Sequence, residues 1–276
     1  MIPIPLYKIT RIDENNQHIY MIDGMPHRLP GATTITKIIA KEHLPQWASK
    51  MCAEYTRKIL TKFTLIPIIQ TPKISPRFLE TLYRRSKKQH RIMFRRAGDV
   101  GTRIHQAFED LISGKIPAMD TDIANCIATF TEFDVIKKMR ITASEMKLIN
   151  LDIGYGCTVD AFAESSDGKM VILEWKSSNQ ISDEYALQIA AQGYAAKFTF
   201  GLDYVPQGYC VRFDKLKPKI EFVKVRSMED SFEGFKFAFG LRNSMNKIQF
   251  VDKKIFKPIK IEKQTKKHKE KSNATT

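Results

Sequence analysis

The fold of this chain is decided by residues 156–176, which read GCTVDAFAESSDGKMVILEWK. Residues 165–168 (SSDG) are typical of a hairpin turn, and residues 170–173 (MVIL) form a short apolar run suited to a buried strand. The stretch therefore predicts two adjacent strands of one sheet. The first strand carries Asp160, and the second ends in Glu174, Trp175 and Lys176.

Two carboxylates and one amine would meet at the same edge of this sheet. Glu174 and Lys176 share one face because side chains alternate along a strand, and Trp175 points the other way. An E-x-K tripeptide is common by chance, and alternating charges often mark a solvated face. Here the tripeptide ends an apolar strand and follows a strand bearing Asp160. Two oxygen ligands for a hard cation beside an ammonium indicate metal-assisted phosphodiester cleavage.

These residues resemble the pattern of the PD-(D/E)XK nuclease superfamily, and within it the RecB-like exonucleases. Such proteins pair an Asp on one strand with a (D/E)-x-K on the next, followed by a helix carrying Gln. The matching residues here are Asp160, Glu174, Lys176 and Gln188. Two departures are Cys157, where the family usually has Gly, and Gln192, where the family helix often has Tyr.

Two upstream segments extend the resemblance, which spans roughly residues 29–215. Residues 101–109 (GTRIHQAFE) are similar to the G-T-x-x-H-x-x-x-E helix of the same group. Residues 29–35 (LPGATTI), followed by Leu44 and Trp47, resemble the opening of phage exonucleases and of the mitochondrial genome maintenance exonuclease. Thr33 and Thr34 of this opening are then expected to contact nucleic acid.

The resemblance also implies a fold and a metal site. We expect an α/β protein with a central mixed β-sheet flanked by helices, a restriction-endonuclease-like core and an N-terminal helical elaboration that covers the active site. Mg²⁺ or Mn²⁺ would be held by Asp160, Glu174, His105 and the carbonyl of Trp175. Lys176 would position a water or stabilise the developing charge, and one metal or two stays open.

The helix around His105 can also be read from its own spacing. Its apolar stripe consists of Val100, Ile104, Phe108 and Leu111. His105 and Glu109 lie four residues apart on the adjoining face. A lone His beside an apolar stripe is usually structural, but the carboxylates of Asp160 and Glu174 favour metal ligation here. Glu109 is expected to orient His105, to bind a metal-bound water or to pair with an arginine.

A glutamine-bearing flank marks the helix after Lys176. Tyr185, Gln188 and Gln192 lie together at spacings of three and four residues. Buried glutamines need partners, so this flank suggests hydrogen bonds to the lysine, a water or a phosphate. For Gln192 an ordinary polar helix face is an equal alternative. Glu145, on the first strand, belongs either to the edge of the site or to its charged rim.

The charge of the chain favours a polyanionic partner. The 276 residues carry a formal net charge of +15. One basic cluster precedes the His105 helix, and we expect it to bind DNA, as single strands or ends: Arg84, Arg85, Lys87, Lys88, Arg91, Arg95, Arg96 and Arg103. A second cluster, residues 253–271, reads as a flexible basic tail that is DNA-binding or merely solubilising.

The cysteines and the N-terminal residues indicate the redox environment and the cellular compartment. Cys52, Cys126, Cys157 and Cys210 are far apart and form no C-x-x-C pair, so reduced thiols are expected. Some RecB-like nucleases carry an iron–sulfur cluster, but only Cys210 follows Lys176, so no such cluster is expected. The N-terminal residues read neither as a signal peptide nor as a membrane span, which favours a cytoplasmic protein without membrane contact.

The chain divides into three predicted regions: an N-terminal hairpin and helical region (1–140), a nuclease core (141–250) and the basic tail (251–276). The predicted strands are 7–12, 18–22, 141–151, 158–163, 170–176, 204–213 and 220–225. The predicted helices are 33–62 in two pieces broken around residues 43–45, 76–113, 122–138, a helix capped by Ser182 and ending near 198, and 231–245. Pro67 and Pro72 mark a linker.

These features together predict a metal-dependent DNA exonuclease acting on single-stranded or frayed ends in replication, repair or recombination. The resemblance, and not the spacing, supplies the exonuclease part. A structure-selective or restriction-type endonuclease is one alternative. A non-catalytic nucleic-acid-binding module is another, although the intact set of Asp160, Glu174 and Lys176 argues against it.

Overall fold

The computed structural model describes residues 3–15, 17–39, 41, 43–64, 74–132, 139–245 and 247. The predicted basic tail, the linker prolines Pro67 and Pro72, and positions 133–138 of a predicted helix lie outside these residues. None of the described helices is both long and apolar enough to cross a membrane.

A five-stranded mixed sheet forms the centre of the molecule, in the order β4-β5-β6-β7-β8. Its strands are β4 (Arg140–Asn150), β5 (Tyr155–Glu164), β6 (Met170–Lys176), β7 (Gln207–Phe213) and β8 (Ile220–Lys224). Only β6 and β7 pair in parallel, and helix α7 (Glu184–Phe200) makes the crossover that such a pair requires. The predicted α/β class, with a central mixed sheet flanked by helices, is confirmed.

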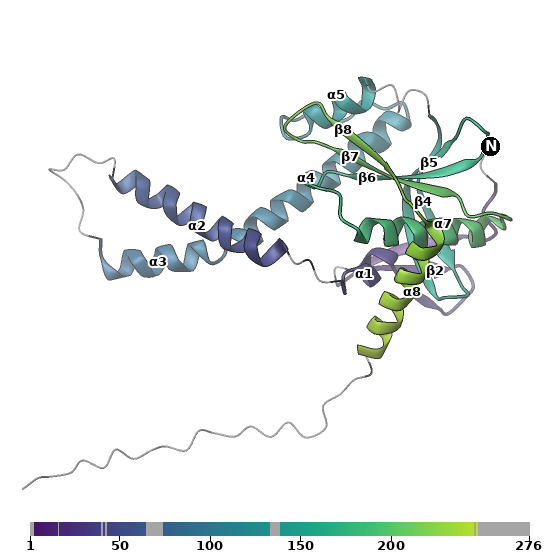
Figure 1. The fold of residues 1–276 in the computed structure, drawn as a ribbon, viewed down its shortest axis with the longest axis horizontal. Helices are drawn as coiled ribbons and strands as arrows, with labels where there is room; N and C mark the ends of the chain where they lie inside the picture. The colour runs from purple at the N-terminus through teal and green to yellow at the C-terminus, as the bar shows by residue number, and fades with distance from the viewer. Residues whose placement is uncertain are drawn as a thin grey trace, which may run out of the picture.

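Helices cover both faces of this sheet (Figure 1). On one face, α7 packs with α1 (Ala32–Thr36) and α8 (Met228–Met245) over an apolar cluster that includes Val159 and Ile172. On the other face, α4 (Gln89–Ile112) and α5 (Ala124–Glu132) enclose an aromatic cluster around Trp175. Strand β6 is buried at every position except Lys176, which explains why its sequence is apolar without alternation.

A second, three-stranded sheet packs against β4 and β5. It consists of β1 (Ile9–Glu14), β2 (Gln17–Ile22) and β3 (Arg28–Pro30). Tyr20 of β2 lies over Gly156 of β5, where an added Cβ would approach the Tyr20 ring to 2.3 Å. The absence of a side chain at Gly156 therefore lets the amino-terminal hairpin approach the central sheet.

Helices α2 (His43–Thr64) and α3 (Pro76–Ser86) form an arm together with the amino-terminal half of α4. Figure 1 shows this arm projecting away from the central sheet. The sequence predicted that these helices cover the active site, and the observed direction of the arm differs from that prediction.

Several predicted boundaries were wrong. The break in the first helical region lies before His43, because Pro45 falls in the first turn of α2, where its missing N–H costs nothing. The single helix predicted for 76–113 divides at Lys87 and Lys88, two residues that carry no helix-breaking signal. Ser182 is not the cap of α7, because Asp183 occupies that position.

Candidate active site

Strands β5 and β6 separate at the point where their acidic residues lie. Their pairing ends at Ala161 and Leu173, and Asp160 and Glu174 come immediately beyond this last pair. There the backbone N–H of Trp175 donates to Oδ2 of Asp160 at 2.7 Å. A side chain thus satisfies a buried backbone donor at the point where the ladder ends. Both carboxylates line one cavity of about 590 Å³.

Helix α4 brings His105 to this fork. The helix buries the stripe Val100, Ile104, Ala107 and Phe108 against the sheet. His105 lies on the neighbouring flank, as the spacing predicted, and its Nδ1 is 3.3 Å from Oδ1 of Asp160. Packing of an apolar stripe therefore fixes the distance between the imidazole and the carboxylate.

Glu145 of β4 joins the same group from the other side of β5. The pairs Ser144–Ala161 and Met146–Val159 flank it, so Glu145 stands directly opposite Asp160 in the register. Its backbone adopts φ 50°, a left-handed conformation that is uncommon for a residue with a side chain. Sequence reasoning left Glu145 at the edge or rim of the site, whereas the structure places it beside Asp160.

His105, Glu145 and Asp160 together could hold a metal ion. One ligand atom from each lies within 4.8 Å of the others. One imidazole nitrogen with two carboxylates suits Mn²⁺ and is compatible with Mg²⁺, which prefers oxygen ligands. Two carboxylates facing each other across paired strands repel, so a cation between them would remove an unfavourable interaction. The donor set therefore fits a divalent cation.

Glu174 is held from three directions. Gln188 donates from Nε2 to Oε1 of Glu174 at 2.6 Å, and Gln192 donates to Oε2 at 2.6 Å. Lys176 also forms an ion pair with Oε1. Gln192 is fully buried and donates in addition to the carbonyl oxygen of Thr158 at 3.0 Å. The structure thus favours the partner role over an ordinary polar helix face for Gln192.

Lys176 contacts two further residues of α7. Its Nζ lies 3.4 Å from Oε1 of Gln188 and 4.8 Å from the ring centre of Tyr185. A cation over an aromatic face is stabilised by the ring quadrupole. The flank that the sequence singled out on this helix, Tyr185, Gln188 and Gln192, therefore surrounds the Glu174–Lys176 pair.

The pKa of each ionisable group in the site depends on burial and on its charged neighbours. Burial opposes the charge on His105, but the adjacent Asp160 and, more weakly, Glu174 raise its pKa to about 9. Burial likewise disfavours the Asp160 carboxylate, yet His105 and Lys176 hold its pKa below the usual value. Burial and the neighbouring Asp160 raise the pKa of Glu174, and they raise that of Glu145 to about 7.

Lys176 stays an ammonium in this environment. Burial would lower its pKa, but Glu174 and Asp160 more than offset that effect and raise it above 10.5. A protonated lysine can donate hydrogen bonds and stabilise negative charge.

The two remaining predicted site residues, Glu109 and Trp175, differ in whether their side chains face the cavity. Glu109 lines the cavity and accepts a hydrogen bond from Gln106 at 3.3 Å. The Trp175 side chain turns away from the cavity into a cluster with Phe108, Phe130 and Phe213. The contact of Trp175 with the site is its N–H bond to Asp160.

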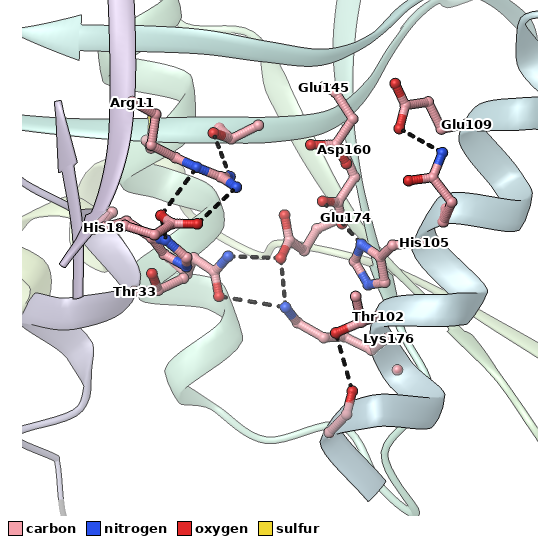
Figure 2. A pocket seen from close by; sticks show the side chains of 18 of the residues that line it. Arg11, His18, Thr33, Thr102, His105, Glu109, Glu145, Asp160, Glu174 and Lys176 are labelled. Atoms are coloured by element: carbon pink, nitrogen blue, oxygen red, sulfur yellow. Dashed lines mark hydrogen bonds and ion pairs between the residues drawn. The ribbon is translucent and has the colours of Figure 1, made fainter. Parts of the chain in front are cut away.

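The sequence reasoning missed one wall of the cavity. Arg11, Asp13, His18 and Tyr20 of the amino-terminal hairpin line it. Figure 2 shows Arg11 and His18 on the side opposite His105 and Glu109 of α4. The only sequence signal for these residues was the hairpin pattern, which says nothing about where the hairpin packs. Their place depends on the contact between Tyr20 and Gly156, which are far apart in the chain.

The predicted nucleic-acid-binding residues lie in three settings. Thr33 lines the cavity, whereas Thr34 is buried beside it. Three arginines are paired with acids: Arg84 with Glu80, Arg96 with Asp122, and Arg103 with Asp120 and Asp122. The others are exposed on the arm and its junction, namely Arg85, Lys87, Lys88, Arg91 and Arg95.

The chain was also compared with known proteins. No model of a known protein family matches it, and no curated protein matches its sequence.

Proposed function

We propose that this chain is a metal-dependent deoxyribonuclease of the PD-(D/E)XK type. The observation that carries the proposal is one cavity in which Asp160, Glu174, Glu145 and His105 meet the ammonium of Lys176. Acidic ligands for a hard cation beside a fixed ammonium suit the hydrolysis of a phosphodiester. The order of the sequence motifs supports the same reaction.

The protein groups have separate tasks in this proposal. Mg²⁺ or Mn²⁺, when bound by His105, Glu145, Asp160 and Glu174, would polarise the phosphate and acidify a water. Lys176 orients that water or stabilises the negative charge that develops on the phosphate. Gln188 and Gln192 hold Glu174 in place by their amide donors.

A nucleic acid is proposed as the substrate because of the charge distribution, and the choice of DNA rests on the resemblance to RecB-like exonucleases. The chain carries a net charge of +15, and the arm exposes many cations, Arg85, Lys87, Lys88, Arg91 and Arg95 among them. Cleavage from the ends of single or frayed strands also rests on that resemblance. Replication, repair or recombination would supply such ends.

Endonuclease action is the second candidate, and the arm favours it. The residues that line the cavity come from β1, β2, α1, α4, β4, β5, β6 and α7. Because α2 and α3 project from the body, an internal segment of a strand could reach the cavity without threading (Figure 1).

One experiment separates these two activities. Labelled linear and covalently closed circular single strands of the same sequence are incubated with the protein and Mn²⁺. An exonuclease degrades the linear strand to short products and leaves the circle intact. Cleavage of the circle at the same rate would establish the endonuclease alternative, and cleavage of neither would refute both. The non-catalytic alternative predicts binding of both DNAs without cleavage.

A further inference from the structure

The wall of the cavity opposite α4 carries a second cationic group, Arg11 of strand β1. In the view of Figure 2, Arg11 and His18 lie on one side of the cavity, and His105 and Glu109 lie on the other. Lys176 is committed to Glu174 and Gln188. Arg11 therefore offers a guanidinium to a bound strand at a point that the metal ligands and Lys176 do not occupy.

The position of Arg11 relative to Asp160 is set by strand β5. Nη1 of Arg11 donates to Oγ1 of Thr158 at 3.4 Å, and the hydroxyl of Tyr20 lies 2.9 Å from the same oxygen. Thr158 precedes Asp160 by two residues, which corresponds to about 6.6 Å along a strand. Neighbouring phosphates of an extended nucleic-acid strand are separated by a similar distance.

The present partner of Arg11 leaves it available to a phosphate. Nε and Nη2 of Arg11 lie 3.4 Å from the two oxygens of Asp13, a long and half-exposed ion pair. Such pairs contribute little to stability. Asp13 also has a second and closer partner, Nδ1 of His18 at 2.6 Å. A phosphate could therefore replace Asp13 at the guanidinium while Asp13 stays bound to His18.

The chemistry of Arg11 suits this exchange. Its guanidinium is planar and always charged, and it binds two phosphate oxygens at once. Only about a third of its side-chain surface is exposed, 31%, so its reach is limited to the cavity. The contacts of Arg11 with Thr158 and Asp13 explain how an arginine can remain inside a cavity that also attracts a cation.

We propose that Arg11 binds the phosphodiester next to the one being cleaved, so that the amino-terminal hairpin forms part of the substrate site. This inference rests on the proposed nuclease function. It assigns Arg11 to substrate binding, with no part in the bond-breaking step.

The test combines a protein change with a matching change in the DNA. Single-stranded oligonucleotides carry one uncharged methylphosphonate linkage on either side of the first linkage cleaved. For the natural protein, one of these neutral linkages should lower kcat/KM by about 10- to 100-fold, mainly through KM, as expected for a charge-assisted hydrogen bond. For Arg11→Ala, kcat/KM with the natural oligonucleotide should already be lower by this factor. Replacing the linkage by the neutral methylphosphonate should then lower kcat/KM no further.

Two controls keep the result specific. Arg28→Ala removes a cation from the same small sheet, where Arg28 pairs with Glu14, and it should retain the full methylphosphonate effect. Arg11→Lys preserves the positive charge but loses the two-pronged guanidinium. The methylphosphonate should therefore still lower kcat/KM, but by a smaller factor. Thermal unfolding of each variant establishes that it is folded.

The outcomes distinguish this inference from the function on which it rests. Binding of oligonucleotides that carry one methylphosphonate, placed at each linkage in turn, is measured in Mn²⁺ for Lys176→Ala and for Lys176→Ala/Arg11→Ala, so that no cleavage is needed. If neither neighbouring linkage couples to Arg11 in binding or in kcat/KM, Arg11 is not a phosphate ligand. If the natural protein cleaves nothing while coupling appears in binding, the nuclease proposal fails and the assignment of Arg11 stands.

Discussion

Glu145 and Asp160 stand directly opposite each other on strands β4 and β5, in a register fixed by the pairs on either side. Like charges at such positions destabilise a sheet, and Glu145 is also in a left-handed backbone conformation. Local strain of this kind persists where the surrounding structure enforces it, and it concentrates at functional sites. We infer that the sheet holds these two carboxylates together for a cation.

The first prediction follows from this repulsion. At pH 8 in chelator, Glu145→Gln should raise the free energy of unfolding by about 1–3 kcal/mol, because it removes a carboxylate whose charge is opposed by burial and by Asp160. The pKa of Glu145 is raised from 4.5 to about 7 by burial and by Asp160. The gain should therefore be absent below pH 4.5, grow as Glu145 ionises toward pH 7, and level off above that value.

Bound Mn²⁺ should reverse the order of stability of the natural protein and Glu145→Gln. With Mn²⁺ in excess, the natural protein should gain more stability than Glu145→Gln, because a ligand that binds the folded state stabilises it. Denaturant unfolding with and without Mn²⁺ measures both effects. Equal stabilisation of the two proteins by Mn²⁺ would contradict a ligand role for Glu145.

His105 is expected to serve the metal and not the DNA. His105→Ala should raise the Mn²⁺ concentration that gives half-maximal cleavage by at least about tenfold, in the range found when groups that support a metal site are removed. Its affinity for single-stranded DNA should change far less. His18→Ala removes an imidazole from the opposite wall of the same cavity, outside the metal group, and is the matched control. A similar metal dependence in both variants would contradict the assignment.

Gly156 is expected to be required for the contact between the hairpin and the central sheet. In Gly156→Ala, the new methyl group would meet the Tyr20 ring at 2.3 Å, so the hairpin must shift. We expect a loss of about 1–3 kcal/mol in unfolding free energy, as for other overpacked sites. Gly240→Ala in α8 meets no atom within 4 Å and should be neutral or stabilising. Thermal unfolding of both variants checks the difference, and equal midpoints would contradict it.

The basic tail is expected to supply affinity. Deletion of residues 253–276 should weaken single-strand binding and reduce its salt dependence by about 0.7 per lost phosphate contact, while cleavage at saturating DNA stays nearly unchanged. Binding titrations at several salt concentrations give the slope. An unchanged slope would mean that the tail does not touch DNA.

The sequence predicted those parts of the site that depend on local spacing. Glu174 and Lys176 share a face because of the strand period, and His105 borders a helical stripe, so both patterns are legible within one element. Gln188 and Gln192 were selected in the same way, and both donate to Glu174.

The parts that depend on distant pairing could not be read in this way. The place of Glu145 requires the β4–β5 register and an irregularity between Ile141 and Ala143, neither of which has a local signal. Arg11 reaches the cavity only because Tyr20 packs on Gly156, more than a hundred residues away. The direction of the arm depends on how α2 packs against α4, and the apolar pattern of each helix leaves that open.

The central claim is metal-dependent phosphodiester cleavage at Asp160, Glu174 and Lys176, and one comparison tests it most directly. End-labelled linear single-stranded DNA is incubated with the natural protein, Glu174→Gln, Lys176→Ala and the surface control Lys169→Ala, each with Mn²⁺ and with chelator. The natural protein and Lys169→Ala should degrade the DNA only with Mn²⁺. Glu174→Gln and Lys176→Ala should be folded, bind DNA and be slower by about 10²–10⁴-fold. Cleavage by the natural protein in chelator, or substantial cleavage by both site variants in Mn²⁺, would contradict the account.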